Sequence, residues 1–306
     1  MGFYHPAQIV MDARKHEVEV RAVDINFSDW DNKLEASPQP LSKGEGLEVS
    51  SERNYHALRL GFRQIKGLRE EDMNLLTGKR KEGFKNIPEL FNAGLSKATL
   101  KKLADADAFR SIGLDRRKAL WEISASDDLP VGIFTGETID EAKVSLPEMT
   151  ISQHVVQDYA ALSLSIKAHP VSFVREKLQQ LHIVSCNELN ALKNGDPIKV
   201  AGLVLVRQRP GTAKGVCFIT IEDETGIANL VVFPNLFEQY RKAIVQSRLL
   251  MVEGKLQREG DVIHVIAEGC YDLSRLLRSL TVAKKVKAPL FDENEEKVFS
   301  ESRNFK

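Results

Sequence analysis

Hydrophobic and polar positions alternate in a strand-like way over the C-terminal half of the chain. Short apolar runs there are separated by RPGTAKG, EDETG and QREGD, which are turn sequences rich in glycine and charged residues. Apolar runs bounded by such residues are typical of β-strands. A helical segment, residues 234–243, follows the third run. The five predicted strands cover residues 200–206, 216–221, 227–233, 248–256 and 261–267.

This order of elements, five strands with a helix between the third and the fourth, is that of the OB-fold. The OB-fold is a small barrel that binds oligonucleotides on one face and in two of its loops. An unrelated β-sandwich or a set of hairpins is the alternative interpretation of the same pattern. We therefore expect a nucleic-acid-binding barrel in this half of the chain.

Side chains suited to nucleic acid lie in and beside the predicted loops of this barrel. Lysine and arginine neutralise phosphates, and an aromatic ring that stacks on a base contributes about 1–3 kcal/mol. Phe218 follows the basic first turn, and Phe233 is a second aromatic candidate, although a core position is the more common place for either. The residues predicted to bind DNA here are Arg207, Arg209, Lys214, Phe218, Lys255 and Arg258.

The N-terminal half has a helical pattern instead. A helix is predicted over PAQIVMDARKH, and a short strand over VEVRAVDI. Residues 53–123 are predicted to be helical and contain two hairpins of similar design. Ile65-Lys66-Gly67-Leu68 forms the turn of the first and Ala93-Gly94-Leu95 that of the second, where Ser96 is placed to cap the next helix.

An apolar–Gly–apolar turn between two short helices is the signature of the helix-hairpin-helix motif. Its glycine adopts a positive φ and leaves amides exposed at a helix N-terminus, where a phosphate can bind. The alternative is an ordinary glycine C-cap beside solvated lysines. Contacts to phosphates add affinity without sequence preference. The residues predicted to bind DNA here are Lys66, Gly67, Arg69, Gly94, Ser96, Lys97 and Lys101.

The charge distribution supports a polyanionic partner although the formal net charge is zero. Residues 53–102 carry 12 Lys and Arg against 5 Asp and Glu, a net charge of +7, whereas residues 103–166 carry 5 against 11, a net charge of −6. Electrostatic binding depends on such local patches rather than on the total. The first of these segments contains both predicted hairpins.

Other classes of function find little support in the residues. The 3 cysteines lack metal-ligand spacing and predict a reduced, cytoplasmic chain. The 7 histidines are scattered, and neither a phosphate-binding P-loop nor a GxSxG nucleophile motif occurs. No apolar run is long enough to cross a membrane. We therefore expect no membrane partner and no cofactor held by this chain.

The order of these parts resembles a known family. The segments GFRQIKGL, GFKNIPELF, LSKATLKKLADADAF and IGLDRRKALW closely resemble the C-terminal part of bacterial error-prone DNA polymerases, C-family relatives of the polymerase III alpha subunit. The opening MGFYHPAQIVMDARKHEVEVRAVDINFSDWD is similar to the end of that family's fingers segment. VAGLVLVRQRPGTAKGVCFITIEDETGIANLVVF is similar to its OB domain.

The resemblance implies an α+β multidomain chain in which a fingers remnant and tandem helix-hairpin-helix motifs precede a five-stranded OB-fold barrel. The implied parts are the end of the fingers segment (1–52), the hairpin region (53–123), a linker with short helices (124–195), the OB-fold domain (196–275) and a disordered tail (276–306).

The resemblance also implies that catalysis lies elsewhere. In this family a palm domain precedes these parts, and its aspartates hold two metal ions for nucleotidyl transfer. No stretch of this chain matches that motif. The acidic sets Asp127-Asp128 and Glu222-Asp223-Glu224 are interpreted as solvated turns rather than metal sites. We expect no polymerase activity from this chain alone, and Mg²⁺ only together with the missing palm.

Two hypotheses of function follow. In the first, the chain is the DNA-binding part of an error-prone polymerase in DNA repair and translesion synthesis. The hairpins would then hold duplex DNA and the barrel the single-stranded template, with the missing N-terminal polymerase portion or other damage-tolerance proteins as partners. In the second, it is a non-catalytic module that joins damage-tolerance components through protein contacts.

Overall fold

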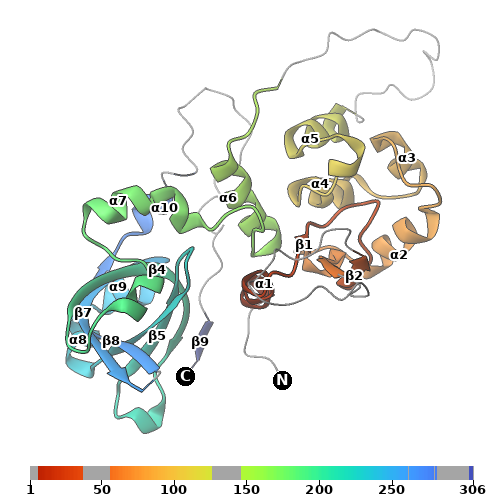
Figure 1. Cartoon of the computed structure of the whole chain (residues 1–306). Coiled ribbons are helices and arrows are strands. Elements are labelled where there is room, and N and C mark those ends of the chain that lie inside the picture. Colours follow the sequence, from red (N-terminus) through yellow and green to blue (C-terminus); the bar gives the residue numbers. More distant parts are fainter. Residues whose placement is uncertain are drawn as a thin grey trace, which may run out of the picture. The chain divides into compact units, whose positions relative to one another are not determined.

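The computed structural model describes residues 6–36, 56–125, 146–260, 262–278 and 280, together with the backbone of residues 303–305. Its contacts form two compact units. The first comprises residues 1–150 and 157–166, and the second comprises residues 151–156 and 167–306. Figure 1 shows helices gathered in the first unit and strands curled into a barrel in the second.

The first unit combines a small sheet with a set of helices. Strand β3 lies between a parallel β1 and an antiparallel β2. The strands are β1 (Val20–Arg21), β2 (Lys33–Ala36) and β3 (His56–Arg59). The helices are α1 (Pro6–Lys15), α2 (Glu70–Lys79), α3 (Ile87–Asn92), α4 (Lys97–Asp105) and α5 (Arg116–Ala125). Of α6 (Ile151–Leu162), the part from residue 157 onward belongs to this unit. The predicted first helix and the strand after it are thus both present.

One hydrophobic core joins the sheet to the helices. Ile25, Phe62 and Phe109 are fully or almost fully buried in it, together with Met73 of α2 and Leu103 of α4. Apolar residues from both sides of residue 52 therefore pack together. The expected division between residues 1–52 and 53–123 stays a prediction about the family's parts, and described residues of both ranges share this core.

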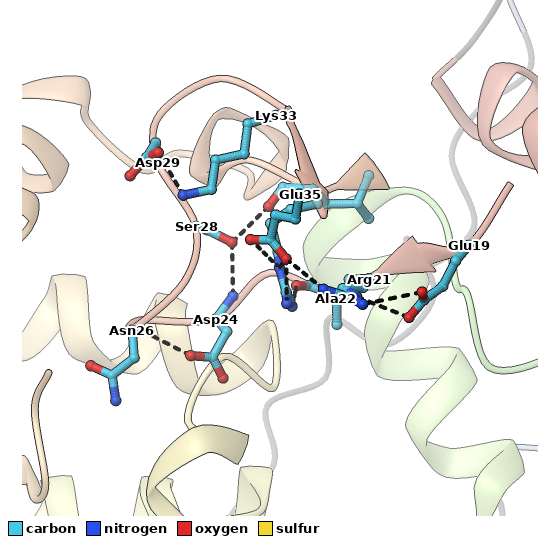
Figure 2. Close-up of polar contacts among 11 residues, drawn as sticks. Glu19, Arg21, Ala22, Asp24, Asn26, Ser28, Asp29, Lys33 and Glu35 are labelled. Carbon is cyan, nitrogen blue, oxygen red and sulfur yellow. Dashed lines mark hydrogen bonds and ion pairs between the residues drawn. The ribbon is translucent and has the colours of Figure 1, made fainter. Parts of the chain in front are cut away.

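The charged residues of the small sheet neutralise one another (Figure 2). Arg59 donates two hydrogen bonds to Glu35 from Nε and one from Nη2, and Arg21 donates a further one at 3.1 Å. Lys33 pairs with Asp29 at 2.8 Å. These arginines and this lysine are therefore structural partners of carboxylates and contribute little net positive charge.

The second unit contains the predicted barrel. Its strands are β4 (Pro197–Gln208), β5 (Cys217–Glu222), β6 (Ile227–Val232), β7 (Leu249–Glu259) and β8 (Val262–Asp272). They follow the order β5-β6-β8-β7-β4, and β4 pairs again with β5, which closes the barrel. Two short helices, α8 (Pro234–Gln239) and α9 (Arg241–Gln246), lie between the third and fourth of these strands. All five predicted strands and the helical interruption are confirmed.

Alternation of side chains places the apolar residues inside this barrel. In β5, Cys217, Ile219 and Ile221 are buried, whereas Phe218 is 40% exposed. Closure also requires a close backbone approach at Gly254, where a Cβ atom would lie 2.1 Å from the carbonyl oxygen of Ile266. The β7–β8 register shifts at this glycine, so the strands bend at a position that no larger residue could occupy.

Short elements flank the barrel. Before it lie α7 (Arg175–Gln180) and 3₁₀ helices at Pro170–Val174 and Asn187–Ala191. After it lie α10 (Ser274–Arg278) and β9 (Arg303–Phe305), which pairs in parallel with residues 206–208 of β4. The expected disordered tail therefore includes regular structure at both of its ends, and residues 281–302 are outside the described part of the chain.

Candidate nucleic-acid interface

The second hairpin has the geometry expected of a phosphate-binding turn. Gly94 has a φ of 92°, and α4 follows it directly. The Ser96 hydroxyl caps α4 by accepting from the Thr99 amide at 3.1 Å, as predicted. No acidic residue lies in the first turn of α4, and Lys101 is exposed on this helix. Lys97 donates to the carbonyl of Ser124 at 3.3 Å, near the same helix start.

The first hairpin is differently equipped. Gly67 has a φ of 68°, but the turn precedes α2, whose first turn contains Glu70, Glu71 and Asp72. Three carboxylates at a helix N-terminus repel a phosphate. Arg69 is exposed at the start of this acidic helix. The Lys66 ammonium donates to carbonyl oxygens of α6, and burial lowers the pKa of Lys66.

A third turn of the same kind was missed from the sequence. Ile112-Gly113-Leu114 precedes α5, and Gly113 has a φ of 78° in the left-handed region. The signal was present in the sequence, because this triplet is again an apolar–Gly–apolar step. Asp115 caps α5 by accepting from the Lys118 amide at 2.9 Å. The first turn of α5 contains no acidic residue, which resembles α4 rather than α2.

The first loop of the barrel presents two exposed cations, one of which stacks on the buried ring of Phe237. Arg209 and Lys214 are exposed, and Lys214 adopts a left-handed conformation with a φ of 49°. The Arg209 guanidinium lies 4.5 Å from the ring centroid of Phe237 and donates to the Gly215 carbonyl. Stacking and the hydrogen bond orient Arg209 while its side chain remains 41% exposed.

Arg207 does not present its guanidinium in this loop. It is 7% exposed, and it donates to the carbonyl of Ile244 at 2.5 Å and to that of Ser247. These carbonyls lie at the C-terminal end of α9. Burial lowers the pKa of Arg207 to about 10, so the side chain stays charged at neutral pH. In the structure the charge of Arg207 holds α9 against the barrel, and its contact with DNA stays a prediction.

Two more predicted cations are engaged in the fold to different degrees. Arg258 donates from Nη2 to the carbonyl of Asn190 at 2.8 Å and to two neighbouring carbonyls, so it secures the 3₁₀ helix before the barrel. The predicted contact of Arg258 with DNA stays a prediction. Lys255 is 59% exposed and pairs with Glu268 at 3.0 Å. Because this ion pair is exposed to solvent and weak, a phosphate can replace Glu268 as the partner of Lys255.

Phe218 belongs to a row of side chains across the outer face of the barrel. The strand registers align Gln208 with Phe218, Phe218 with Val231, Val231 with Ile266 and Ile266 with Lys255. Directly paired residues share one face of a sheet. The row therefore has an apolar centre and a cation at one end. Because Phe218 is half-exposed, the alternative of a core aromatic is excluded for it.

A polar row runs beside the apolar one. Thr220 pairs with Asn229, Asn229 with His264 and His264 with Gln257. The Thr220 hydroxyl donates to the Asn229 amide oxygen at 3.0 Å. These residues are not recognisable from the sequence, because single amides and hydroxyls in strands carry no pattern of their own. Phe233, 50% exposed, immediately follows β6.

The acidic turn after β5 is not solvated, which corrects another expectation. Asp223 is fully buried and accepts from the Cys186 amide at 2.8 Å and from Arg175 at 2.7 Å. Burial raises the pKa of Asp223, but hydrogen bonds from Thr225 and Cys186 outweigh it, so the net shift is downward. Asp223 is thus a structural centre that joins the segment before the barrel to the β5–β6 turn.

Within the described residues, no group of three or more His, Cys, Asp or Glu side chains is placed to hold a metal ion. Asp127 and Asp128 lie outside the part of the chain that the structure describes. Among the described helices, none is long and apolar enough to span a membrane.

Two families match separate parts of the chain. Residues 17–119 match the helix-hairpin-helix motif, and residues 198–273 match the OB-fold nucleic acid binding domain. The first match includes all three glycine turns, and the second covers the barrel. Both predicted motifs are confirmed.

Larger relatives contain both parts. Error-prone DNA polymerase 1 of Rhizobium meliloti (strain 1021) is 47% identical over 297 residues, which cover 90% of this chain and 26% of that protein. Error-prone DNA polymerase of Caulobacter vibrioides is 43% identical over 320 residues, which cover 100% of this chain and 29% of that protein. The chain thus spans between a quarter and a third of the length of these curated relatives.

Among solved structures, asparaginyl-tRNA synthetase from Pyrococcus horikoshii is 28% identical over 30% of this chain and 23% of that chain, with a TM-score of 0.26. This TM-score is too low to add to the fold assignment.

Proposed function

We propose that this chain, which is homologous to the C-terminal portion of error-prone DNA polymerases, is the part of such an enzyme that holds its DNA. The observation that carries the proposal is the outer face of the barrel, where Phe218 heads an apolar row beside the exposed cations Arg209 and Lys214. An aromatic platform next to cations is how single strands are bound without sequence preference.

The barrel face suits single-stranded DNA better than duplex. A base can stack on Phe218 only if it is unpaired and turned outward. Its sugar-phosphate backbone would then pass the first loop, where Arg209 and Lys214 neutralise charge. Amides and hydroxyls of the polar row, such as Asn229 and Thr220, can accept or donate to base edges. The barrel therefore positions single-stranded template.

The second and third hairpin turns suit duplex DNA. Gly94 and Gly113 each lead into a helix whose first turn contains no acidic residue of its own. The neighbouring carboxylates are that of Asp72, which accepts from Thr99 in α4, and that of Asp115, which caps α5. The first backbone N–H groups of such helices point at a bound anion, and the helix dipole favours its charge. Lys101 adds an exposed cation at the second turn. Grip on phosphates fixes the position of the duplex without reading its sequence.

The proposal assigns nucleotidyl transfer to residues outside this chain. It also includes a role of the whole enzyme in DNA repair and translesion synthesis. Purified chain with a primed template, dNTPs and Mg²⁺ is expected to yield no primer extension. Extension at a rate above that of a buffer control would overturn this assignment.

Fluorescence anisotropy with a labelled oligothymidine tests the barrel. Phe218→Ala should raise the Kd by about 5- to 150-fold, which corresponds to the 1–3 kcal/mol of one stacked base. Phe27→Ala is the matched control, because Phe27 is 51% exposed but belongs to the other unit. Equal Kd values for both variants and the unmodified chain would contradict the proposed platform. Undetectable binding of single strands by the unmodified chain would favour the protein-interaction module.

A further inference from the structure

The first hairpin turn is already occupied by another part of the chain. The backbone N–H of Lys66 donates to the carbonyl of Ala161 at 2.9 Å. Its ammonium donates to the carbonyls of Ala160 at 2.8 Å and Tyr159 at 3.1 Å. Gln64, in the 3₁₀ turn before it, donates from Nε2 to the carbonyl of Leu162 at 3.2 Å.

These four acceptors are the last four carbonyls of α6. The C-terminal four carbonyls of an α-helix have no partner within the helix, so they must be satisfied from outside. They also carry the negative end of the helix dipole, equivalent to about half an elementary charge. To the first hairpin, the end of α6 therefore presents the same features as a phosphate: clustered acceptor oxygens with partial negative charge.

A lysine side chain and nearby carboxylates further disfavour the approach of DNA to this turn. The Lys102 ammonium donates to the carbonyl of Gly67, and a Cβ atom on Gly67 would meet that nitrogen at 3.5 Å. The long side chain of Lys102 thus lies over the glycine where the backbone of a nucleic acid would approach. The carboxylates of Glu70 and Glu71 at the start of α2 add repulsion at this turn, whereas that of Asp72 accepts from the Thr99 hydroxyl in α4.

A buried ion pair holds the same end of α6 from its other side. Arg116 of α5 donates to Asp158 at 2.6 Å, and their side chains are only 2% and 3% exposed. The Ser165 hydroxyl donates to the second oxygen of Asp158 at 2.8 Å. The position of α6 is therefore set by two independent groups of contacts, one of which is the hairpin turn.

We propose that the first hairpin turn is a docking site for the C-terminal end of α6 and receives no DNA phosphate, so that the second and third turns alone grip the duplex. Lys66 is a positioning residue that satisfies the helix end. This inference rests on the proposed function for its statement about duplex DNA, but the docking itself does not depend on DNA binding.

Salt dependence of duplex binding separates the two roles of a lysine. The slope of log K against log salt changes by about 0.9 for each phosphate contact that is lost. Lys101→Ala should reduce the slope by about one unit and weaken duplex binding. Lys66→Ala should leave the slope within error of the unmodified chain. A reduction by about one unit in Lys66→Ala as well would overturn the proposal.

Amide hydrogen exchange tests the docking directly, in the full chain without DNA. The amide of residue 66 donates to Ala161, and that of Ser163 donates to Tyr159. Lys66→Ala should raise exchange at both, whereas Lys101→Ala should not, and Lys66→Arg should restore protection because a guanidinium can also serve several carbonyls. Unchanged exchange in Lys66→Ala would refute the docking role.

Gln64→Ala is a second variant that removes one donor but keeps the lysine. It should raise amide exchange at Ser163 and leave the salt slope of duplex binding unchanged. Rapid exchange of the Ser163 amide in the unmodified chain would refute the docking itself. If the unmodified chain binds no duplex DNA at all, the proposed function is refuted. The docking of α6 is then tested by the amide exchange measurements alone.

Discussion

Asp158→Ala should strongly destabilise the first unit, because it removes a carboxylate that pairs with the buried Arg116 guanidinium. Both side chains are almost completely excluded from water, and their 2.6 Å hydrogen bond directly links α5 and α6. Removing one partner of such a buried pair costs about 3–5 kcal/mol. The Ser165 hydroxyl also loses its acceptor. The loss is comparable to the whole stability of many domains, which is about 5–15 kcal/mol.

Tryptophan fluorescence during urea unfolding measures this loss in the first unit alone. The chain has 2 tryptophans, Trp30 and Trp121, and both belong to that unit. With an m-value of about 2 kcal/mol per molar urea, the midpoint should fall by roughly 1.5–2.5 M. The CD signal of the barrel should keep its transition, because the pair lies outside the second unit.

Two controls define the result that would refute this reasoning. Asp31→Ala breaks an ion pair in the same unit, Arg63–Asp31, whose side chains are 57% and 67% exposed, and it should cost less than about 1 kcal/mol. The double variant with Arg116→Met and Asp158→Leu replaces the pair by apolar groups and should recover much of the loss. A loss below 1 kcal/mol in Asp158→Ala, or a double variant as unstable as the single one, would show that the pair is not isolated from water.

Three further predictions follow from other contacts. Gly94→Ala should destabilise the first unit by about 1–2 kcal/mol in the same urea assay, because the φ of Gly94 is 92°, in the left-handed region. Gly78→Ala in α2 is the control and should be neutral or stabilising, because the space around its Cβ position is open. Burial lowers the pKa of His169 to about 4, below its ordinary 6.5, so between these pH values only the unfolded chain takes up a proton at this residue. The stability of the second unit should therefore fall by on the order of 3 kcal/mol as the pH drops from 6.5 to 4. In CD-monitored unfolding, His169→Gln should remove most of this pH dependence. Arg207→Met should lower the stability of the barrel by about 2 kcal/mol. It should change the Kd for single-stranded DNA less than Arg209→Ala does. A larger change of the Kd in Arg207→Met than in Arg209→Ala would show that Arg207 contacts DNA.

Local patterns sufficed to predict most of the elements. The five strands of the barrel and the helical interruption are where the apolar runs place them, because alternation with period two and turn residues act over a few positions. Strands β4, β7 and β8 are longer than predicted, since pairing extends them into polar positions such as Gln208. Gly67, Gly94 and the Ser96 cap are equally local and are confirmed in conformation.

The candidate site was predictable only in part. Residue type identifies a cation but not its partner, and the partner decides its role. Lys66, Lys101 and Lys214 are all exposed, but the Lys66 ammonium satisfies a helix end that lies about 90 positions further along the chain. The buried Arg207 satisfies one about 40 positions away. The Asp223 turn looked solvated for the same reason, because its donors Cys186 and Arg175 are distant in sequence.

The sequence by itself therefore determined the kinds of element, their order, and a nucleic-acid-binding family for each half of the chain. Tertiary structure alone decided which charges are available to DNA. The physical reason is that burying a cation or a carboxylate requires a partner, and helix ends supply partners from anywhere in the chain. Two hairpin turns with the same local signature thus have different surroundings: the first turn of the helix after Gly94 contains no acidic residue of its own, and Gly67 lies beneath Lys102 and next to the docked end of α6.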